Sequence, residues 1–167
     1  METIDLERVH QSYIDHLDKI KATIDNKRKM QMDNLVDVIK KHEGCRLDMY
    51  KDTVGVWTIG YGHNLEEGID QETADFILAR DLEKHSQELD KHKPMWKELP
   101  DPAQIVILSM QFNMGWNRFS KFVKFWEAIE KKDYQTAGKE MQNSRWWGQV
   151  KSRGPELQEL LVSISEV

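Results

Sequence analysis

Two acidic side chains and one hydroxyl lie close together in the sequence, in a segment rich in turn-forming residues. Glu43, Asp52 and Thr58 all fall within residues 43–63. Hydrolysis of a glycosidic bond needs a protonated carboxyl group for the leaving oxygen and an ionised carboxylate for water or for the anomeric carbon. Glu43 is the candidate acid and Asp52 the candidate carboxylate. Two acids at this spacing are by default solvated surface residues, so the elements around them decide the interpretation.

The neighbouring residues predict a helix followed by a hairpin. Apolar positions on one face predict a helix that Asp33 begins and Gly44 ends, which puts Glu43 in its last turn. Turn-forming residues at 52–55 separate two strand-like runs and predict a short antiparallel hairpin. A carboxyl between the helix end and the hairpin would be desolvated and favour its protonated form, whereas an acid in the exposed turn would stay ionised.

The rest of the chain predicts helices. Asp70 is placed to cap a long helix that runs to about His92, and Asp101 begins a helix that is apolar almost all round until Gly115, as expected of a helix buried at the centre of a domain. Three further helices are predicted at residues 120–131, 133–143 and 155–165. The predicted fold class is therefore α+β and mostly helical, with a small β-hairpin lobe and a helical lobe around a central buried helix.

Composition excludes several classes of function. The formal net charge of -5 over 167 residues gives no clustered cations for nucleic acid. No run of residues is apolar and long enough to span a bilayer, and the charged N-terminus argues against a cleaved secretion signal. One cysteine, Cys45, excludes an internal disulfide; as a nucleophile with His63 as its base it is a weaker reading than a small residue packed under the hairpin. We expect no cofactor and no metal, because His42, Glu43, Asp48 and His63 lack a ligand spacing.

Residues 1–30 differ from the remainder, and we expect a charged helical extension followed by one domain at residues 31–167. Apolar residues recur there at helical spacing and form one narrow stripe: Leu6, Val9, Tyr13, Leu17, Ile20 and Ile24. A helix on the domain surface, a coiled coil with another chain and a disordered tail all fit this pattern. Self-association or partner binding through this segment follows from the second reading.

The segment around the two acids contains Glu43-Gly44, Leu47, Tyr50, Lys51-Asp52-Thr53, Gly55 and Thr58-Ile59-Gly60-Tyr61-Gly62-His63. In these residues it resembles the signature of the phage-type lysozymes, the T-even phage endolysin family. Later motifs agree in order and approximate spacing: Phe112-Asn113-Met114-Gly115, Ser144-Arg145-Trp146 and Arg153. The resemblance covers about residues 32–165.

The resemblance implies a two-lobed lysozyme-like fold and a muramidase that cleaves the β-1,4 bond between N-acetylmuramic acid and N-acetylglucosamine in peptidoglycan. It implies that Glu43 is the general acid and that Asp52 and Thr58 position water for inversion, with carboxyls about 6.5–9.5 Å apart; a retaining route needs about 5–5.5 Å. It further implies a set of substrate contacts, by Asn113, Phe112, Gly62 and Arg153.

The resemblance also leaves structural alternatives at several of these residues. It implies that Arg153 lies near Glu43, although a surface arginine at a helix start fits as well, and Asn113 is either a substrate ligand or a buried polar cap. It implies that His63 forms a structural ion pair with Asp81. Trp146 and Trp147 are expected to pack in the core, with a platform for stacking a sugar as the alternative.

Two rival functions share these residues. A lytic transglycosylase needs Glu43 alone and yields an anhydro sugar, and a lysozyme-fold binding or virion protein would dock through residues 1–30. The expected partner of the leading reading is the peptidoglycan glycan strand, without nucleic acid or stable membrane insertion. The expected location is the host bacterial cytoplasm before release to the wall, with virion association as the alternative.

Overall fold

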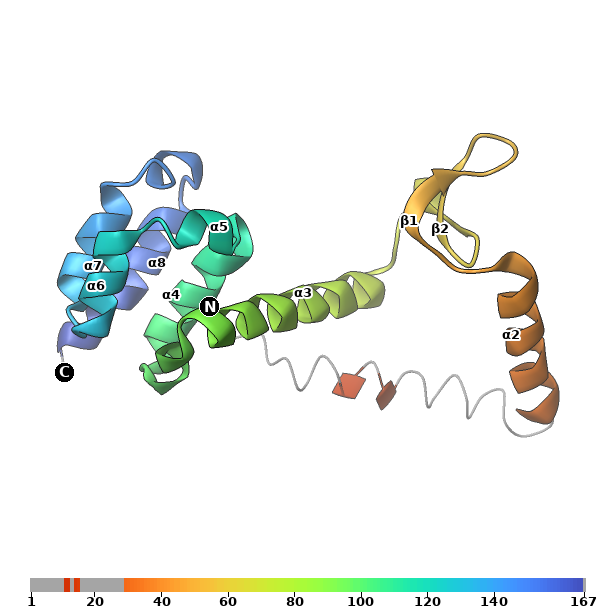
Figure 1. The fold of residues 1–167 in the computed structure, drawn as a ribbon, viewed down its shortest axis with the longest axis horizontal. Helices are drawn as coiled ribbons and strands as arrows, with labels where there is room; N and C mark the ends of the chain where they lie inside the picture. The colour runs from red at the N-terminus through yellow and green to blue at the C-terminus, as the bar shows by residue number, and fades with distance from the viewer. Residues whose placement is uncertain (1–10, 13, 16–28, 167) are drawn as a thin grey trace. The chain divides into compact units, whose positions relative to one another are not determined.

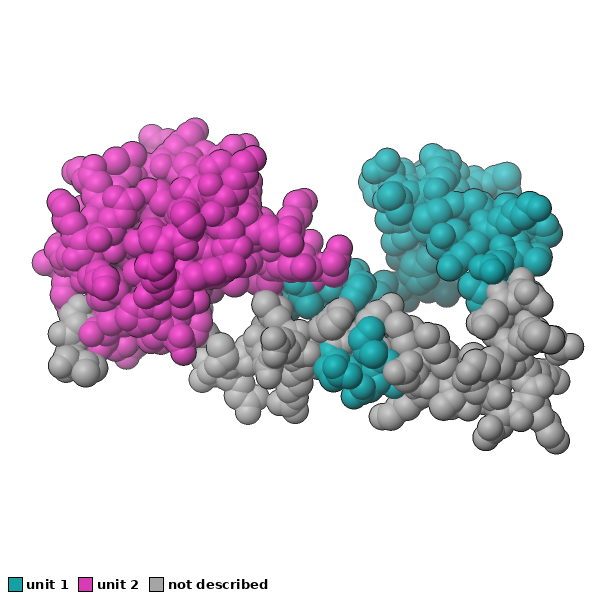
Figure 2. Space-filling view, turned by 60° about the horizontal axis from the view of Figure 1, so that its bottom comes forward, with its two compact units in different colours: residues 1–79 teal, residues 80–167 magenta. Residues whose placement is uncertain are grey.

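Two compact units divide the chain, residues 1–79 and residues 80–167, called here the first and the second unit (Figure 2). The computed structural model of the chain describes residues 11–12, 14–15 and 29–166. The four residues described before residue 29 are helical. The apolar stripe predicted for residues 1–30 lies outside the described residues, so the extension stays a prediction.

Helix α2 (Lys29–Glu43) opens the continuous part of the first unit (Figure 1). Its last turn carries basic residues, which suit the negative end of a helix dipole. Gly44 ends the helix in the left-handed region, with φ +65, and its N–H donates to the Lys40 carbonyl at 3.1 Å. The prediction that Glu43 stands in the last turn of a helix is therefore confirmed.

A three-stranded antiparallel sheet follows, in the order β1-β2-β3. It consists of β1 (Arg46–Lys51), β2 (Trp57–Gly60) and the two-residue β3 (His63–Asn64). The predicted hairpin is β1 and β2, with Lys51 opposite Trp57. Gly55 in the turn has φ +92, a conformation that favours glycine. Thr58 is buried, and it is the one buried residue among those of the first unit whose side chains the structure describes.

A short 3-10 turn, η1 (Leu65–Glu67), leads to the long helix α3 (Gln71–His92), whose residues are divided between the two units. The predicted cap is present, since the Asp70 Oδ1 atom accepts a hydrogen bond from the Thr73 N–H at 2.8 Å. The helix ends before Pro94, which begins η2 (Pro94–Glu98). Leu89 is its fully buried residue.

The second unit is built on α4 (Asp101–Met114), the helix predicted at the core. Ala103, Val106, Ile107 and Met110 of this helix are fully buried. Around it come α5 (Trp116–Phe119), α6 (Val123–Glu130), α7 (Tyr134–Gln142), η3 (Trp147–Gln149), α8 (Arg153–Val162) and η4 (Ser163–Glu166). Helix α7 lies beside both α6 and α8, and α8 contacts α4 (Figure 1). The core therefore gathers around α4, and the mostly helical α+β class predicted from the sequence is confirmed.

The later helices differ from their predicted bounds in ways that local chemistry explains. The helix expected to start at Ser120 starts at Val123, because the short α5 and a turn occupy residues 116–122. Asp133 caps α7 as expected: its Oδ1 atom accepts from the Thr136 N–H at 2.9 Å, and this backbone hydrogen bond lowers the pKa of Asp133. In the part of the chain that the structure describes, no helix is both long and apolar enough to cross a membrane.

Candidate functional site

Glu43, the candidate acid, lies next to the glycine Gly62. It is the last residue of α2 and is exposed within its unit. Its Oε2 atom is 3.9 Å from the position that a β-carbon would take on Gly62, in the turn between β2 and β3. Gly62 has φ +96, so a side chain there would be strained. The structure thus brings together two predicted site residues, but the first unit does not itself supply the desolvation expected for the Glu43 carboxyl.

Asp52, the candidate carboxylate, is fixed by the hairpin turn that it begins. Its Oδ1 atom accepts hydrogen bonds from the backbone N–H groups of Val54, at 2.9 Å, and Val56, at 2.8 Å. The Asp52 N–H donates in turn to the Val56 carbonyl at 2.9 Å. Both side-chain bonds engage Oδ1, so the direction of Oδ2 is set while that oxygen is left for another partner.

Thr58 is joined to the same residue. It is 5% exposed, stands at the centre of the sheet, and pairs with Tyr50 on one side and Asn64 on the other. Its Oγ1 atom donates to the Val56 carbonyl at 3.1 Å. Val56 therefore binds Asp52 through its N–H and Thr58 through its carbonyl. This linking role was not predicted from the sequence, because the side chain of a valine does not reveal it.

His63 and Gly62 line a pocket of the first unit with a volume of about 500 Å³. The remaining lining residues are Arg46, Leu47, Ile59, Gly60 and Tyr61. The His63 Nε2 atom is 3.2 Å from the Gly68 carbonyl oxygen. A carbonyl oxygen only accepts, so Nε2 is the protonated nitrogen in this hydrogen bond. The predicted partner Asp81 belongs to the second unit, and the ion pair stays a prediction.

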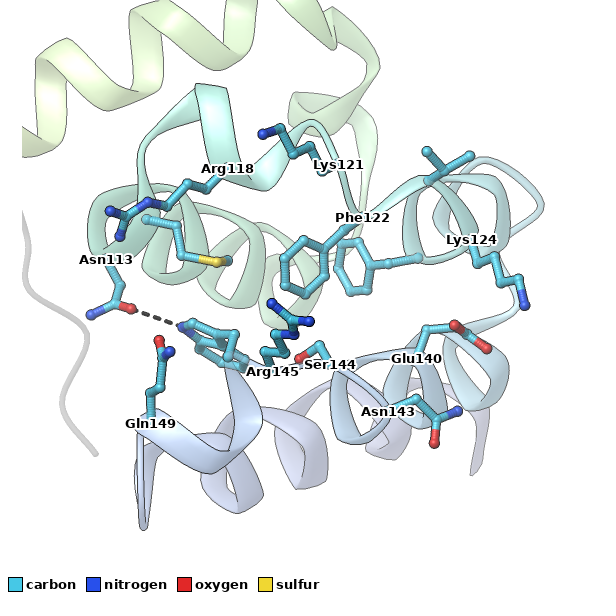
Figure 3. Close-up of a pocket in the computed structure, with 14 residues that line it drawn as sticks. Asn113, Arg118, Lys121, Phe122, Lys124, Glu140, Asn143, Ser144, Arg145 and Gln149 are labelled. Carbon is cyan, nitrogen blue, oxygen red and sulfur yellow. Dashed lines mark hydrogen bonds between the residues drawn. The ribbon is translucent and has the colours of Figure 1, made fainter.

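Asn113, in the second unit, is held by a tryptophan. Its Oδ1 atom accepts from the Trp146 Nε1–H at 2.8 Å (Figure 3). Trp146 is 4% exposed and belongs to the core, as predicted, whereas Asn113 is exposed rather than a buried cap. An indole nitrogen only donates, so the Asn113 carbonyl must face it and the Nδ2 hydrogens remain for a ligand.

The other two predicted substrate contacts of this unit lie elsewhere. Phe112 is 37% exposed and meets the His85 ring edge-on, with centroids 5.5 Å apart. Arg153 begins α8 and is exposed; its N–H donates to the Val150 carbonyl at 3.0 Å. A contact between Arg153 and Glu43 would join the two units and stays a prediction.

A larger pocket of about 780 Å³ lies in the second unit (Figure 3). Of the predicted site residues, Asn113 lines it. Its walls come from the end of α4, from α5 and α6, and from α7 with the residues that follow, up to Gln149. This pocket was not predicted from the sequence, because its lining residues stand far apart in the chain.

Two minor chemical readings can be compared with the structure. Cys45 is exposed, so the expectation that it packs under the hairpin is wrong within this unit; the residue lies between the helix-ending Gly44 and the first strand residue. Among the described residues, no group of three or more His, Cys, Asp or Glu side chains is placed to hold a metal ion.

Comparison with known proteins gives the class: a lysozyme, a glycoside hydrolase that acts on peptidoglycan. The chain belongs to the phage lysozyme family, whose model matches residues 40–161. The probable T4-type lysozyme 1 of Dictyostelium discoideum is 29% identical over 150 residues, covering 72% of this chain and 88% of that protein. The endolysin of Acyrthosiphon pisum secondary endosymbiont phage 1 is 30% identical over 121 residues, covering 70% and 79%. The pre-baseplate central spike protein Gp5 of Enterobacteria phage T4 is 24% identical over 159 residues, covering 78% of this chain and 28% of that protein.

Proposed function

We propose that the protein is a muramidase that cleaves the β-1,4 bond between N-acetylmuramic acid and N-acetylglucosamine with inversion. Glu43 gives its proton to the glycosidic oxygen as the bond breaks. Asp52 takes a proton from a water molecule that attacks the anomeric carbon from the opposite face of the sugar, and Thr58 helps to position that water. Each turnover leaves Glu43 ionised and Asp52 protonated, and solvent restores both.

The hydrogen bonds that meet at Val56 are the observation that carries this proposal. A general base must present one defined oxygen to water. The backbone N–H groups of Val54 and Val56 hold Asp52 by hydrogen bonds of 2.9 and 2.8 Å to its Oδ1 atom. Thr58 bonds the same residue at 3.1 Å, so its hydroxyl and the carboxylate share one anchor. Oδ2 and the second hydrogen-bonding capacity of Oγ1 remain for water.

The surroundings of Glu43 support its role as the acid. Its Oε2 lies 3.9 Å from where a β-carbon would stand on Gly62, so glycine leaves the space beside the carboxyl open to a sugar. The first unit leaves Glu43 exposed. We therefore assign to the bound glycan the exclusion of water from this carboxyl, which favours its protonated form. The pocket lined by Gly62 and His63 adjoins this position and suits a saccharide unit.

On the substrate side, we assign Asn113 the recognition of a hydrogen-bond acceptor, such as an N-acetyl carbonyl, because its amide hydrogens are the free groups. Phe112 offers an exposed ring to a sugar face. Arg153 is assigned to the Glu43 carboxylate that forms after proton transfer, and His63 with Asp81 to a structural ion pair.

We further propose that residues 1–30 form a separate charged extension that binds a second copy or a partner, before a catalytic domain at residues 31–167. The protein would stay in the host cytoplasm until release to the wall. The similarity to a protein described as a baseplate central spike makes virion association the alternative.

Digestion of purified murein tests the reaction, the bond and the acid together. Wild type should release muropeptides with new reducing ends at N-acetylmuramic acid, and Glu43→Gln should release none. Glu66→Gln is the matched control, since Glu66 is an exposed glutamate of the same unit outside the proposed site. Anhydro products would instead identify a lytic transglycosylase, and equal digestion by Glu43→Gln would refute the assignment. The anomer formed first, read by NMR, tests inversion.

A further inference from the structure

The part of α3 that belongs to the second unit meets α4 through two pairs of long side chains. The His85 ring on α3 lies against the Phe112 ring on α4, with the ring centroids 5.5 Å apart and the ring planes at 73°. The Nε2–H of Gln111 on α4 donates to the Glu88 Oε2 atom on α3 at 2.7 Å. His85 and Glu88 are three residues apart and therefore share one face of α3. Two contacts side by side fix how α3 is placed along α4.

The hydrogen bond of this junction belongs to a buried polar side chain. Gln111 is fully buried, although the other fully buried residues of α4 are apolar. A buried amide costs free energy unless it finds a hydrogen-bond partner, and Glu88 supplies one for its Nε2 atom. If α3 slid along α4, this donor would lose its acceptor. The bond therefore disfavours other placements of the two helices.

The His85 ring is enclosed at one edge. The residue is half-buried, and its Nδ1 atom is buried without a hydrogen-bond partner among the described residues. Packing against Phe112, rather than a hydrogen bond to Nδ1, therefore places the imidazole. The ring acts here as an aromatic surface in contact with α4.

Phe112 has the opposite character, since it is 37% exposed. Edge-to-face aromatic pairs are more favourable than the area that they bury, so the contact with His85 favours one orientation of the Phe112 ring. A side chain that is ordered before a ligand arrives loses less conformational entropy on binding. The next residue, Asn113, is held in a comparable way by Trp146, at 2.8 Å. Two adjacent side chains at the end of α4 are thus set in place by neighbours.

We propose that His85 is a positioning residue, which holds the Phe112 ring in the orientation that meets a sugar face. It contributes to glycan binding without touching the glycan. The inference rests on the proposed function, which makes Phe112 a substrate contact. A ring that packs on the sugar equally in the ground state and in the transition state affects KM rather than kcat.

Steady-state hydrolysis of soluble murein fragments tests this role. His85→Ala should raise KM about fivefold at unchanged kcat, which is the size expected for one lost aromatic pair. His85→Phe keeps a ring at this position and should bring KM to within about twofold of wild type. His92→Ala is the matched control. It removes a histidine of the same helix whose ring stacks on Trp116, with centroids 4.5 Å apart, and KM should stay at the wild-type value.

A double-mutant cycle separates positioning from a general loosening of the fold. In a Phe112→Ala background His85→Ala has no ring left to position, so it should leave KM unchanged. The proposal would be overturned by an unchanged KM in His85→Ala, by an equal rise of KM in both backgrounds, or by a fall in kcat at constant KM. Failure of His85→Phe to restore KM would overturn it as well.

Binding is measured separately, so that failure of the proposed reaction can be recognised. The same substitutions are made in the Glu43→Gln protein, which is titrated calorimetrically with the soluble murein fragments. Kd should rise about fivefold in His85→Ala and stay constant in His92→Ala. This result without hydrolysis by wild type would refute the muramidase assignment and support the positioning of Phe112. Hydrolysis by wild type with equal Kd values would keep the muramidase and refute the positioning.

Discussion

Replacement of Asp52 separates its structural role from its chemical one. Asp52→Asn keeps an acceptor oxygen at the same position, so the hydrogen bonds from the N–H groups of Val54 and Val56 can persist. Asp52→Ala removes both. The two variants lose the carboxylate equally, and any difference between them in folding therefore measures the hydrogen bonds.

The geometry gives the expected size of that difference. A hydrogen bond of ordinary geometry contributes about 1 kcal/mol net, and side-chain caps of backbone N–H groups fall in the same range. The bond to Val54 is exposed and that to Val56 part-buried, so water replaces the first more readily. We expect Asp52→Ala to lower the free energy of unfolding by about 1–2 kcal/mol and Asp52→Asn by less than about 0.5 kcal/mol.

Activity should not follow stability in this pair. Loss of a general base lowers the rate by about 100- to 10,000-fold, and both variants lose it. Urea unfolding, monitored by circular dichroism, gives the stabilities, and release of reducing ends from murein gives the rates. If Asp52→Asn is as unstable as Asp52→Ala, the hydrogen bonds do not hold the turn. If Asp52→Asn hydrolyses murein at the wild-type rate, Asp52 is not the base.

Three further predictions concern the second unit. In Gly138→Ala the new β-carbon would lie 2.8 Å from a methyl carbon of the stiff Val162 side chain. Thermal unfolding should therefore show that the free energy of unfolding falls by about 1–2 kcal/mol. In the control Gly148→Ala the new β-carbon would have nothing within 4 Å, and the free energy of unfolding should not fall. The hydrogen bond from Lys97, assisted by that from Trp96, holds the pKa of Asp90 below its usual 3.8. Asp90→Asn should therefore lower the melting temperature at pH 7, and the gap should close as the pH falls below about 4, because a lowered carboxyl pKa stabilises the fold only while the group is ionised; a constant gap would contradict this. Trp146→Phe frees the Asn113 amide to rotate and should raise KM about fivefold with little change in kcat. An unchanged KM would show that Trp146 does not position Asn113 for the substrate.

The local structure around the proposed site of the first unit was largely predictable because its signals are local. Gly44 ends a helix and Asp52 begins a turn through chemistry contained in a few neighbouring residues, and both positions came out as expected. The role of Val56 was not predictable, since its contribution is made by backbone atoms that any residue carries. The strand β3 was missed for a related reason: two residues are too few to show an alternating pattern.

The second unit shows where local signals end. Helix α4 was predicted because its apolar residues surround it, and it is the buried helix of that unit. The pocket was not predicted, because Arg118 and Arg145 become neighbours of one cavity only through the packing of helices around α4. Helix α5 has four residues, too few to show a helical period in the sequence, so it was not predicted. The predicted start of the next helix, α6, was therefore placed too early.

The contrast in burial between the units has a consequence for how each opens. Within the first unit Thr58 is the only buried residue among those whose side chains are described, whereas the second unit encloses a core around α4 that includes Ile107 and Met110. Local opening takes least free energy where few apolar contacts must separate. Backbone amides of β2 should thus take up deuterium well before those of α4, so the hairpin that carries the proposed base in its turn would be the more readily remodelled part of the enzyme.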